Sequence, residues 1–399
     1  MNPNIARLQP YPFERLAALT RDVTPPAGLE PIRLTIGEPK HAPPAFVLER
    51  LRESLAGVAS YPLTAGQPAL RAACARWLEQ RFSLGDGAVD EETMVLPVNG
   101  TREALFAFAH ASIDPAADAR VAMPNPFYQI YEGAALLAGA TPLYLDTGEE
   151  NGWLPDLDAV ATADWDRCAL LYLCTPGNPS GAIMPLDYLA RAVELADRHD
   201  FVIASDECYS EVHFDEAAPP PGLLQACAHL GRRDFARCVV FHSLSKRSNL
   251  PGLRSGFVAG DPRLIGQFRL YRTYHGCSMP EYVQQASIAA WQDEAHVVEN
   301  RRLYREKFDT VLPLLEDVLD VRHPDASFYL WPRTPGEDAA FARDLLAATN
   351  VAVLPGSYLG RDAGRGNPGA NRLRISLVAS AAACEDAARR IRDFVLNRK

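Results

Sequence analysis

The sequence feature that most constrains the fold is an alternation of short apolar runs with helical stretches between residues 94 and 259. Six apolar runs have the length of buried strands: Met94–Val98, Arg120–Met123, Cys168–Leu173, Phe201–Ser205, Cys238–Phe241 and Gly256–Ala259. Helical stretches separate most of these runs, among them Thr101–Ala111, Pro185–Arg198 and Gly222–Ala228. This alternation is typical of a mostly parallel sheet covered by helices on both faces. We therefore predict an α/β fold.

Polar motifs follow five of these predicted strands at the point where each strand ends. In chain order they are Asn99-Gly100-Thr101, Pro124–Tyr128, Thr175–Gly181, Asp206–Tyr209 and Ser243–Lys246. Open α/β sheets bind their ligands outside the carboxyl ends of the strands. We therefore expect these five motifs to meet at one edge of the sheet and to form a binding site there.

The segment from Cys238 to Phe257 carries the most specific chemistry. Its apolar strand ends in Ser-Leu-Ser-Lys246, and an Asn-Leu-Pro-Gly turn then leads to Arg254. A lysine at this edge can be partly desolvated, which lowers its pKa and makes the amine nucleophilic towards an aldehyde. Serines and an arginine suit a phosphate. The combination suggests pyridoxal 5′-phosphate held as a Schiff base, and the alternative for this segment alone is a solvated loop with basic residues.

The pattern changes after about residue 284, which indicates a second domain of α+β type. A long helix at 283–315 is followed by predicted strands at 321–323, 328–331, 351–354 and 373–376, and by helices at 338–347 and 382–396. A chain of 399 residues has room for one large and one smaller domain. We divide it into an N-terminal arm with a small-domain strand (1–44), a large domain (45–283) and a small C-terminal domain (284–399).

The composition of the chain argues against several classes of binding partner. The formal charge of −10 argues against nucleic acid or an anionic membrane as a partner. No apolar run approaches the length of a membrane span, and the N-terminus lacks the build of a signal peptide. The eight cysteines form no Cys-x-x-Cys pair, and His and Cys do not cluster with metal-ligand spacing. We therefore expect a cytoplasmic protein without a metal site.

In its ordered set of strand-end motifs, the chain resembles the pyridoxal-phosphate-dependent aminotransferases of fold type I, class I/II, over nearly its whole length. The resemblance implies a large domain with a mostly parallel seven-stranded sheet and a smaller α+β domain. It also implies an enzyme that uses pyridoxal 5′-phosphate, takes amino acids and 2-oxo acids as substrates, and works as a homodimer.

The resemblance assigns the catalytic residues position by position. Lys246 matches the lysine that forms the Schiff base and moves the proton of the reaction. Asp206 matches the acid that pairs with the pyridine nitrogen, and Tyr209 matches the phenol that bonds the ring oxygen. Asn178 matches the second partner of that oxygen. Tyr128 matches the aromatic side chain that stacks on the ring, with Phe127 as the alternative, because the family's usual Pro-Gly-Tyr-Pro is replaced here by Pro-Phe-Tyr-Gln.

The remaining assignments concern anions. The expected phosphate ligands are the backbone of Gly100, Thr101 and Arg102 at a helix start, and the side chains of Ser243, Ser245 and Arg254. Tyr61 resembles the tyrosine that reaches the phosphate of the neighbouring subunit. Arg374 matches the arginine that binds the substrate α-carboxylate, and Gly37 matches the small residue beside it.

Within the family, the motifs at 36–41, 124–131 and 245–256 look most like those of the bacterial N-succinyldiaminopimelate aminotransferases of lysine synthesis. That resemblance implies transfer of an amino group from N-succinyl-LL-2,6-diaminopimelate to 2-oxoglutarate. Both ligands carry a distal carboxylate, for which Lys40 and Arg272 are the candidate cations. Alternative enzymes are an aspartate, alanine, aromatic or N-acetylornithine aminotransferase, or a carbon–sulfur lyase. A transcriptional regulator would need an added helix-turn-helix module, which the acidic sequence lacks.

Overall fold

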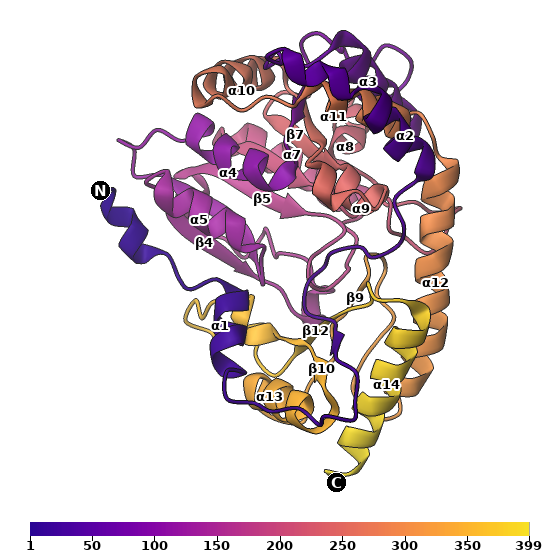
Figure 1. Cartoon of the computed structure of the whole chain (residues 1–399). Coiled ribbons are helices and arrows are strands. Elements are labelled where there is room, and N and C mark those ends of the chain that lie inside the picture. The colour runs from indigo at the N-terminus through magenta and orange to yellow at the C-terminus, as the bar shows by residue number, and fades with distance from the viewer. Residues whose placement is uncertain (399) are drawn as a thin grey trace.

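The computed structural model describes residues 1–398, and a seven-stranded sheet lies at its centre (Figure 1). The strands run in the order β2-β8-β7-β6-β5-β3-β4. β8 pairs antiparallel with both of its neighbours, whereas the other pairings in the sheet are parallel. The other six strands therefore share one direction. The bounds are β2 (Val95–Val98), β3 (Arg120–Asn125), β4 (Thr141–Asp146), β5 (Cys168–Cys174), β6 (Val202–Asp206), β7 (Cys238–Ser243) and β8 (Gly256–Gly260).

This sheet confirms the predicted α/β class and the seven strands, and each of the six strands read from the sequence is present. β4 is the strand that the apolar pattern missed. It lies at the edge of the sheet, next to β3, and most of its side chains are half-buried or exposed. An edge strand that begins Thr141-Pro142 lacks the continuous apolar run that marks a central strand.

Helices cover both faces of the sheet, because the strands alternate apolar side chains between two cores. On β5, Leu171 and Leu173 belong to one core, while Leu170 and Tyr172 belong to the other. The first core is closed by α3 (Pro68–Arg81), α7 (Leu186–His199), α8 (Leu223–His229) and α11 (Glu281–Trp291). The second is closed by α4 (Thr101–Ser112), α5 (Gln129–Leu137) and α10 (Pro262–His275).

A smaller group of elements lies at the lower end of the molecule in Figure 1 and has its own apolar core. β1 (Ile32–Arg33) pairs with β10 (Val351–Ala352), and a second small sheet has the order β11-β12-β9. The bounds are β9 (Tyr329–Leu330), β11 (Leu354–Pro355), β12 (Leu373–Ser376), α12 (Ala295–Leu315), α13 (Asp338–Thr349) and α14 (Ala381–Leu396). The β1–β10 pair supports grouping the N-terminal strand with the C-terminal third, and the division at 44 and 283 stays a proposal.

Two predicted elements of this region are wrong. The single helix at 283–315 is two helices, α11 and α12, separated at residues 292–294. The Asp293 carboxylate accepts a hydrogen bond from the backbone N–H of His296 at 3.0 Å. This bond satisfies a donor at the start of α12, so a second helix begins there. The predicted strand at 321–323 is irregular backbone, and the nearby pairing is an isolated bridge between Asp320 and Arg333.

The remaining helices are short. They are α1 (Pro12–Leu19), α2 (Ala45–Glu53), α6 (Thr162–Trp165) and α9 (Leu244–Arg247), with 3-10 turns at Pro3–Arg7, Leu55–Ala59, Glu149–Asn151, Pro251–Leu253 and Gly356–Tyr358. Of these, α2, α6 and α9 each contribute one buried side chain to the first core: Val47, Trp165 and Leu244. Within residues 1–398, no helix combines the length and the apolar character needed to cross a membrane.

Candidate active site

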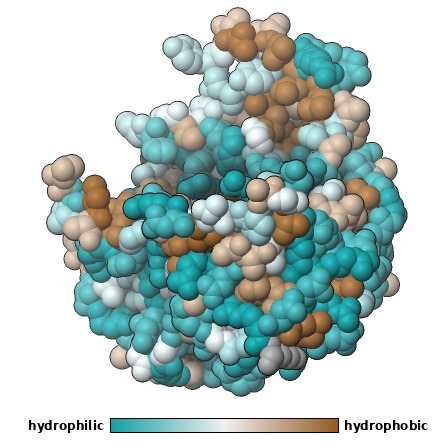
Figure 2. All heavy atoms as spheres, turned by 60° about the horizontal axis from the view of Figure 1, so that its bottom comes forward, coloured by the Kyte–Doolittle hydropathy of each residue, from teal (hydrophilic) through white to brown (hydrophobic). Residues whose placement is uncertain are grey.

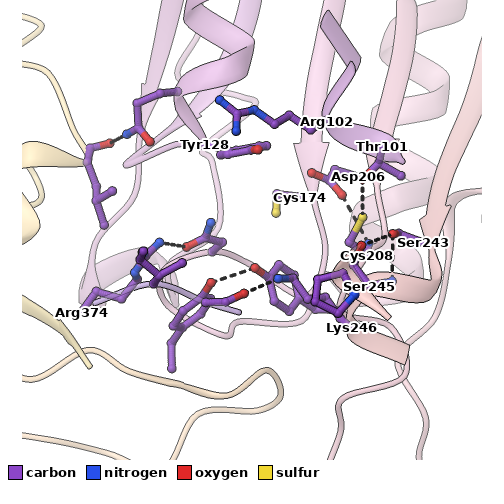
Figure 3. Close-up of a pocket in the computed structure, with 18 of the residues that line it drawn as sticks. Thr101, Arg102, Tyr128, Cys174, Asp206, Cys208, Ser243, Ser245, Lys246 and Arg374 are labelled. Carbon is purple, nitrogen blue, oxygen red and sulfur yellow. Dashed lines mark hydrogen bonds between the residues drawn. The ribbon is translucent and has the colours of Figure 1, made fainter. Parts of the chain in front are cut away.

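A cavity of about 340 Å³ opens at the carboxyl edge of the parallel strands, where the sheet meets the smaller group of elements. Because β8 runs in the reverse direction, its beginning lies at this edge, which places Arg254 beside the ends of the other strands. Most of the residues selected from the sequence line this one cavity (Figure 3): Gly37, Thr101, Arg102, Tyr128, Asn178, Asp206, Tyr209, Ser243, Ser245, Lys246, Arg254 and Arg374.

Lys246 lies in the short helix α9, directly after β7, and its amine points into the cavity. The amine donates a hydrogen bond to the backbone carbonyl of Gly37 and lies 5.5 Å from the centre of the Phe328 ring. Burial lowers the pKa of Lys246 to about 8. At pH 7 about a tenth of an amine with this pKa is uncharged and nucleophilic, which is far more than for a lysine with the ordinary pKa of about 10.4.

Asp206 is the last residue of β6, and its carboxylate is buried in the cavity floor. The Tyr131 hydroxyl donates to it at 2.8 Å, and the backbone N–H of Cys208 donates at 3.3 Å. Burial raises the pKa of Asp206, since no cation among residues 1–398 forms an ion pair with it. The cavity thus holds a buried acid that a cationic group would stabilise.

A pair of tyrosines lies on the side of the cavity nearest Lys246. The hydroxyl groups of Tyr209 and Tyr329 are 2.9 Å apart, and both side chains are buried. Burial raises the pKa of both phenols, so both are protonated at neutral pH and can donate hydrogen bonds. Gly37 packs against Tyr329 and Phe328, and a Cβ at position 37 would collide with the Tyr329 hydroxyl.

Arg374, on β12, is a buried cation without an acidic partner among the described residues. It donates to the Asn178 side-chain oxygen at 3.0 Å and to the Thr35 carbonyl at 2.9 Å. Its Nε atom is buried and has no hydrogen-bond partner. A buried guanidinium with an unused donor is costly unless an anion approaches it. Arg374 is therefore suited to bind a carboxylate.

Opposite Arg374, the start of α4 and the end of β7 form a cradle for an anion. Gly100 has a φ of +84° and turns the chain from β2 into the helix, so that backbone N–H groups of the first turn face the cavity. The Ser243 and Ser245 hydroxyls lie 2.9 Å apart beside it. The Arg254 guanidinium lies so close to Gly100 that a Cβ there would collide with it. Hydroxyls, N–H groups and a guanidinium together suit a phosphate.

Three of the selected residues do not join this group. Tyr61 is fully exposed, with 102% of its reference surface accessible. Lys40 is exposed and pairs with Glu38. Arg272 is buried in α10 and donates to Glu103 at 2.7 Å and to the carbonyl of Cys277 at 3.3 Å.

The position of Arg272 does not support its candidate role as the cation for a distal carboxylate. Its charge is already neutralised by Glu103, and it does not line the cavity. Lys40 does not line the cavity either. Sequence reasoning could not exclude these two, because pairing between residues far apart in the chain leaves no local signal.

Several residues that line or support the cavity were not selected from the sequence. They are Tyr11, Phe13, Gln129, Tyr131, Cys174, Cys208 and Tyr329. Tyr131 could have been predicted from the sequence, since it lies near the start of the helix that follows Tyr128. Tyr11 and Phe13 could not, because only the tertiary fold brings the N-terminal segment to the cavity.

Comparison with known proteins identifies the family of the chain. Residues 30–391 match the model of the family described as aminotransferase class I and II. An LL-diaminopimelate aminotransferase of Nitratidesulfovibrio vulgaris is 35% identical over 393 residues, covering 97% of each chain. The solved structure of an aminotransferase from Neisseria meningitidis superposes with a TM-score of 0.94 and 49% identity, covering 99% of this chain and all of the other. A probable N-succinyldiaminopimelate aminotransferase from Thermus thermophilus gives 0.85 and 27%, covering 96% and 99%.

A fold with an amine, a buried acid and an anion cradle at one sheet edge defines a pyridoxal-phosphate-dependent enzyme. The chain belongs to the class I and II aminotransferases, and it uses pyridoxal 5′-phosphate. The residues present fit that cofactor. The cradle at Gly100 and Arg254 suits its phosphate, the unpaired carboxylate of Asp206 suits a ring cation, and the amine of Lys246 suits its aldehyde.

Proposed function

We propose that this aminotransferase transfers the amino group of N-succinyl-LL-2,6-diaminopimelate to 2-oxoglutarate, in the synthesis of diaminopimelate and lysine. The observation that supports an amino acid as the substrate is the environment of Arg374. It is a buried guanidinium with an unused Nε donor, in the same cavity as the Lys246 amine. An α-carboxylate bound there would bring the neighbouring α-amino group and α-carbon towards Lys246.

The proposed roles of the catalytic residues follow from their positions. The cofactor, when bound, supplies an aldehyde that captures amino groups and a ring that withdraws electrons from the substrate α-carbon. The Lys246 amine would hold this aldehyde, and it would serve as the base that moves a proton at the substrate α-carbon. Asp206 would keep the ring nitrogen protonated, because a buried carboxylate stabilises a cation beside it.

The remaining residues bind and orient. Tyr209 and Asn178 are proposed to bond the ring oxygen, and Tyr128 to stack on the ring. The side chains of Ser243, Ser245 and Arg254 would hold the phosphate, together with the backbone N–H groups at the start of α4. Because Gly37 has no Cβ, the Tyr329 hydroxyl can lie against it. The Gly37 carbonyl accepts a hydrogen bond from the Lys246 amine.

The identity of the amino donor rests on the relatives and on the motifs. One similar solved structure is described as a probable N-succinyldiaminopimelate aminotransferase. A second candidate donor is unacylated LL-diaminopimelate, because curated relatives with 30–35% identity are named LL-diaminopimelate aminotransferases. The two donors share the reacting end and differ only at the distal amine, so the same catalytic residues serve both.

A transamination panel tests the assignment. The purified protein, loaded with cofactor, is assayed for glutamate formation from 2-oxoglutarate and one donor at a time: the N-succinyl donor, LL-diaminopimelate, N-acetylornithine, aspartate, alanine and phenylalanine. We expect the highest kcat/KM with the N-succinyl donor. Equal or better turnover of aspartate, alanine or phenylalanine would contradict the assignment, and release of ammonia without 2-oxoglutarate would indicate a lyase.

The lowered pKa of Lys246 predicts how cofactor capture depends on pH. The neutral amine is the reactive form, so the rate of capture by the apoprotein should rise with pH and level off above about 8. Visible absorbance after mixing with pyridoxal phosphate measures this rate. N-α-acetyl-lysine is the reference, because its rate should continue to rise towards the ordinary lysine pKa of about 10.4. A protein rate that also rises through pH 10 would contradict the prediction.

We also propose that the enzyme is a cytoplasmic homodimer in which Tyr61 reaches the phosphate of the neighbouring subunit. In the segment around Tyr61, the side chains of Leu55, Val58 and Leu63 are all more than half exposed. Figure 2 shows apolar side chains gathered on the projecting upper part of the molecule. Such a patch on an otherwise charged surface marks a protein interface. Sedimentation analysis tests this, and a monomer at assay concentration would contradict it.

A further inference from the structure

The geometry points to the side chain of Gln129 as a specificity-determining residue, whose Oε1 atom accepts a hydrogen bond from the N–H of an acylated distal amine. This inference rests on the proposed function and extends it, because it assigns a residue to the recognition of the acyl-amide group. Gln129 stands where the usual Pro-Gly-Tyr-Pro motif of the family has its second proline. The resemblance therefore assigns no role to this side chain.

The amide group of Gln129 has a fixed orientation. Its Nε2 atom donates to the backbone carbonyl of Phe127 at 3.1 Å and to that of Leu359 at 3.4 Å. Carbonyl oxygens only accept hydrogen bonds, so the nitrogen end of the amide must face them and the oxygen end must face away. The two contacts use both N–H groups of the amide. Oε1 is therefore the polar atom that this side chain can offer to a ligand.

The Oε1 atom of Gln129 is accessible to a ligand. The side chain lines the cavity and is half-buried. In the part of the chain that the structure describes, Oε1 accepts no hydrogen bond, and it is not fully buried. The two hydrogen bonds of Nε2 already restrain the side chain, so little conformational entropy is lost when Oε1 binds a donor.

The surroundings of Gln129 suit the far end of a long substrate. Phe13 packs against the apolar cluster that contains Leu359, and both side chains line the cavity, where methylene groups can pack against them. Figure 3 shows Tyr128, the residue before Gln129, across the cavity from Lys246. A substrate whose reacting end lies at Lys246 can therefore place its methylene groups along this wall and its distal nitrogen at Gln129.

The charges of the cavity favour an acylated distal nitrogen over a free amine. Asp206 is the one acid among the described residues that line the cavity, and it is proposed to pair with the ring nitrogen of the cofactor. A distal ammonium group would leave water without a carboxylate to pair with it, which is costly. The N–H of an acyl amide is neutral and needs only an acceptor, which Oε1 of Gln129 supplies. The N-succinyl donor therefore fits this cavity better than unacylated LL-diaminopimelate does.

Gln129→Met tests the assignment, because it keeps the length of the side chain and removes the acceptor. The holoenzyme is titrated by calorimetry with 6-acetamidohexanoate and with 6-acetoxyhexanoate, two unreactive acids in which an amide N–H is replaced by an ester oxygen. The amide nitrogen lies as far from the carboxylate as the acylated nitrogen does in the N-succinyl donor. We expect the selectivity, Kd for the ester divided by Kd for the amide, to fall by about 5- to 50-fold in Gln129→Met.

A second variant tests the same position by charge. Gln129→Glu places a carboxylate where the structure has a neutral amide. It should bind 6-aminohexanoate, which carries a distal ammonium group, about 3- to 10-fold more tightly than the wild type does. Equal or weaker binding of 6-aminohexanoate by the variant would count against a distal nitrogen at this position.

Gln285→Met is the matched control. Gln285 is likewise a half-buried glutamine whose Nε2 atom donates a hydrogen bond, to Gln67 Oε1 at 2.6 Å, but it does not line the cavity. This variant should keep the wild-type selectivity for the amide. A cofactor titration followed by visible absorbance checks that each variant still binds pyridoxal phosphate.

An unchanged selectivity between ester and amide in a cofactor-loaded Gln129→Met protein would overturn the inference. If the wild-type enzyme still prefers the N-succinyl donor in the transamination panel in that case, the proposed function stands and only the role of Gln129 is wrong. If the wild type does not turn over the N-succinyl donor while Gln129→Met loses its selectivity for the amide, the subsite is supported and the proposed donor is wrong.

Discussion

Replacing Lys246 by alanine is expected to remove the visible absorbance of protein-bound cofactor and to lower transamination by about 10⁴-fold or more. The amine of Lys246 is proposed both to hold the cofactor aldehyde and to move the proton at the substrate α-carbon. Its removal therefore eliminates two functions at once. Spectra of the purified variant mixed with pyridoxal phosphate, and glutamate formation under saturating substrates, measure the two effects.

The sequence makes this test unusually clean, because it contains only four lysines. Lys40 is exposed and paired with Glu38, and Lys399 lies outside the described residues. Lys307 is buried in α12, where its amine donates to the carbonyl of Leu377 at 3.2 Å. Borohydride reduction followed by peptide mass analysis should place the cofactor on the peptide that contains Lys246.

Lys307→Met is the matched control for this experiment. Burial lowers the pKa of Lys307 to about 8, the value given for Lys246, yet Lys307 does not line the cavity. We expect Lys307→Met to keep the visible band. A reduced cofactor found on the Lys307 or Lys40 peptide, or a band that survives in Lys246→Ala, would show that another lysine is the anchor and that the assignment is wrong.

Replacing Asp206 by alanine is expected to lower kcat while the cofactor stays bound. Lys246 and the phosphate cradle are separate from Asp206 and still hold the cofactor, so the visible band should remain. The loss of one partner of a buried charge pair costs about 3–5 kcal/mol, which corresponds to a fall of about 10²- to 10⁴-fold in rate. Single-turnover kinetics of the substrate-induced colour change measure it.

Two further variants distinguish an effect of the Asp206 charge on kcat from an effect of lost side-chain packing. Asp206→Asn keeps the size of the side chain and an oxygen for the Tyr131 hydroxyl, so its kcat should fall nearly as far as that of Asp206→Ala if charge is the cause. Asp261 is another buried aspartate that directly follows a strand, β8, where it caps α10 at the opposite edge of the sheet. Asp261→Asn should lose stability but keep kcat. A wild-type kcat in Asp206→Asn would contradict the role of its charge.

The strand-end motifs made much of the cavity predictable. Each of Thr101, Asp206 and Lys246 follows or ends an apolar run, and parallel strands bring such positions to one edge. The apolar run at 256–259 predicted the position of β8 but not its reversed direction, and Arg254 was selected because it precedes that strand in a recognisable motif. The edge strand β4 was missed because a half-exposed strand shows no continuous apolar run.

Contacts between distant segments were not predictable in the same way. The Arg272–Glu103 pair joins residues on two different helices, and it gives an acidic partner to a cation that the sequence analysis had proposed for a substrate carboxylate. The contact between the hydroxyls of Tyr209 and Tyr329 likewise joins the end of the large sheet to β9.

The break between α11 and α12 depends on a local capping bond at Asp293 that the apolar pattern does not show.

The fold class and the order of the chemical groups at the strand ends could be predicted from the amino-acid order, because local apolar periodicity and the direction of parallel strands specify them. The cations available to a substrate could not be predicted, because they depend on packing between distant segments. The residue type specifies the charge of an arginine, whereas the tertiary fold specifies which acidic side chain, if any, pairs with it. Thus Arg272 is neutralised by Glu103, whereas Arg374 lines the cavity and has no acidic partner among residues 1–398.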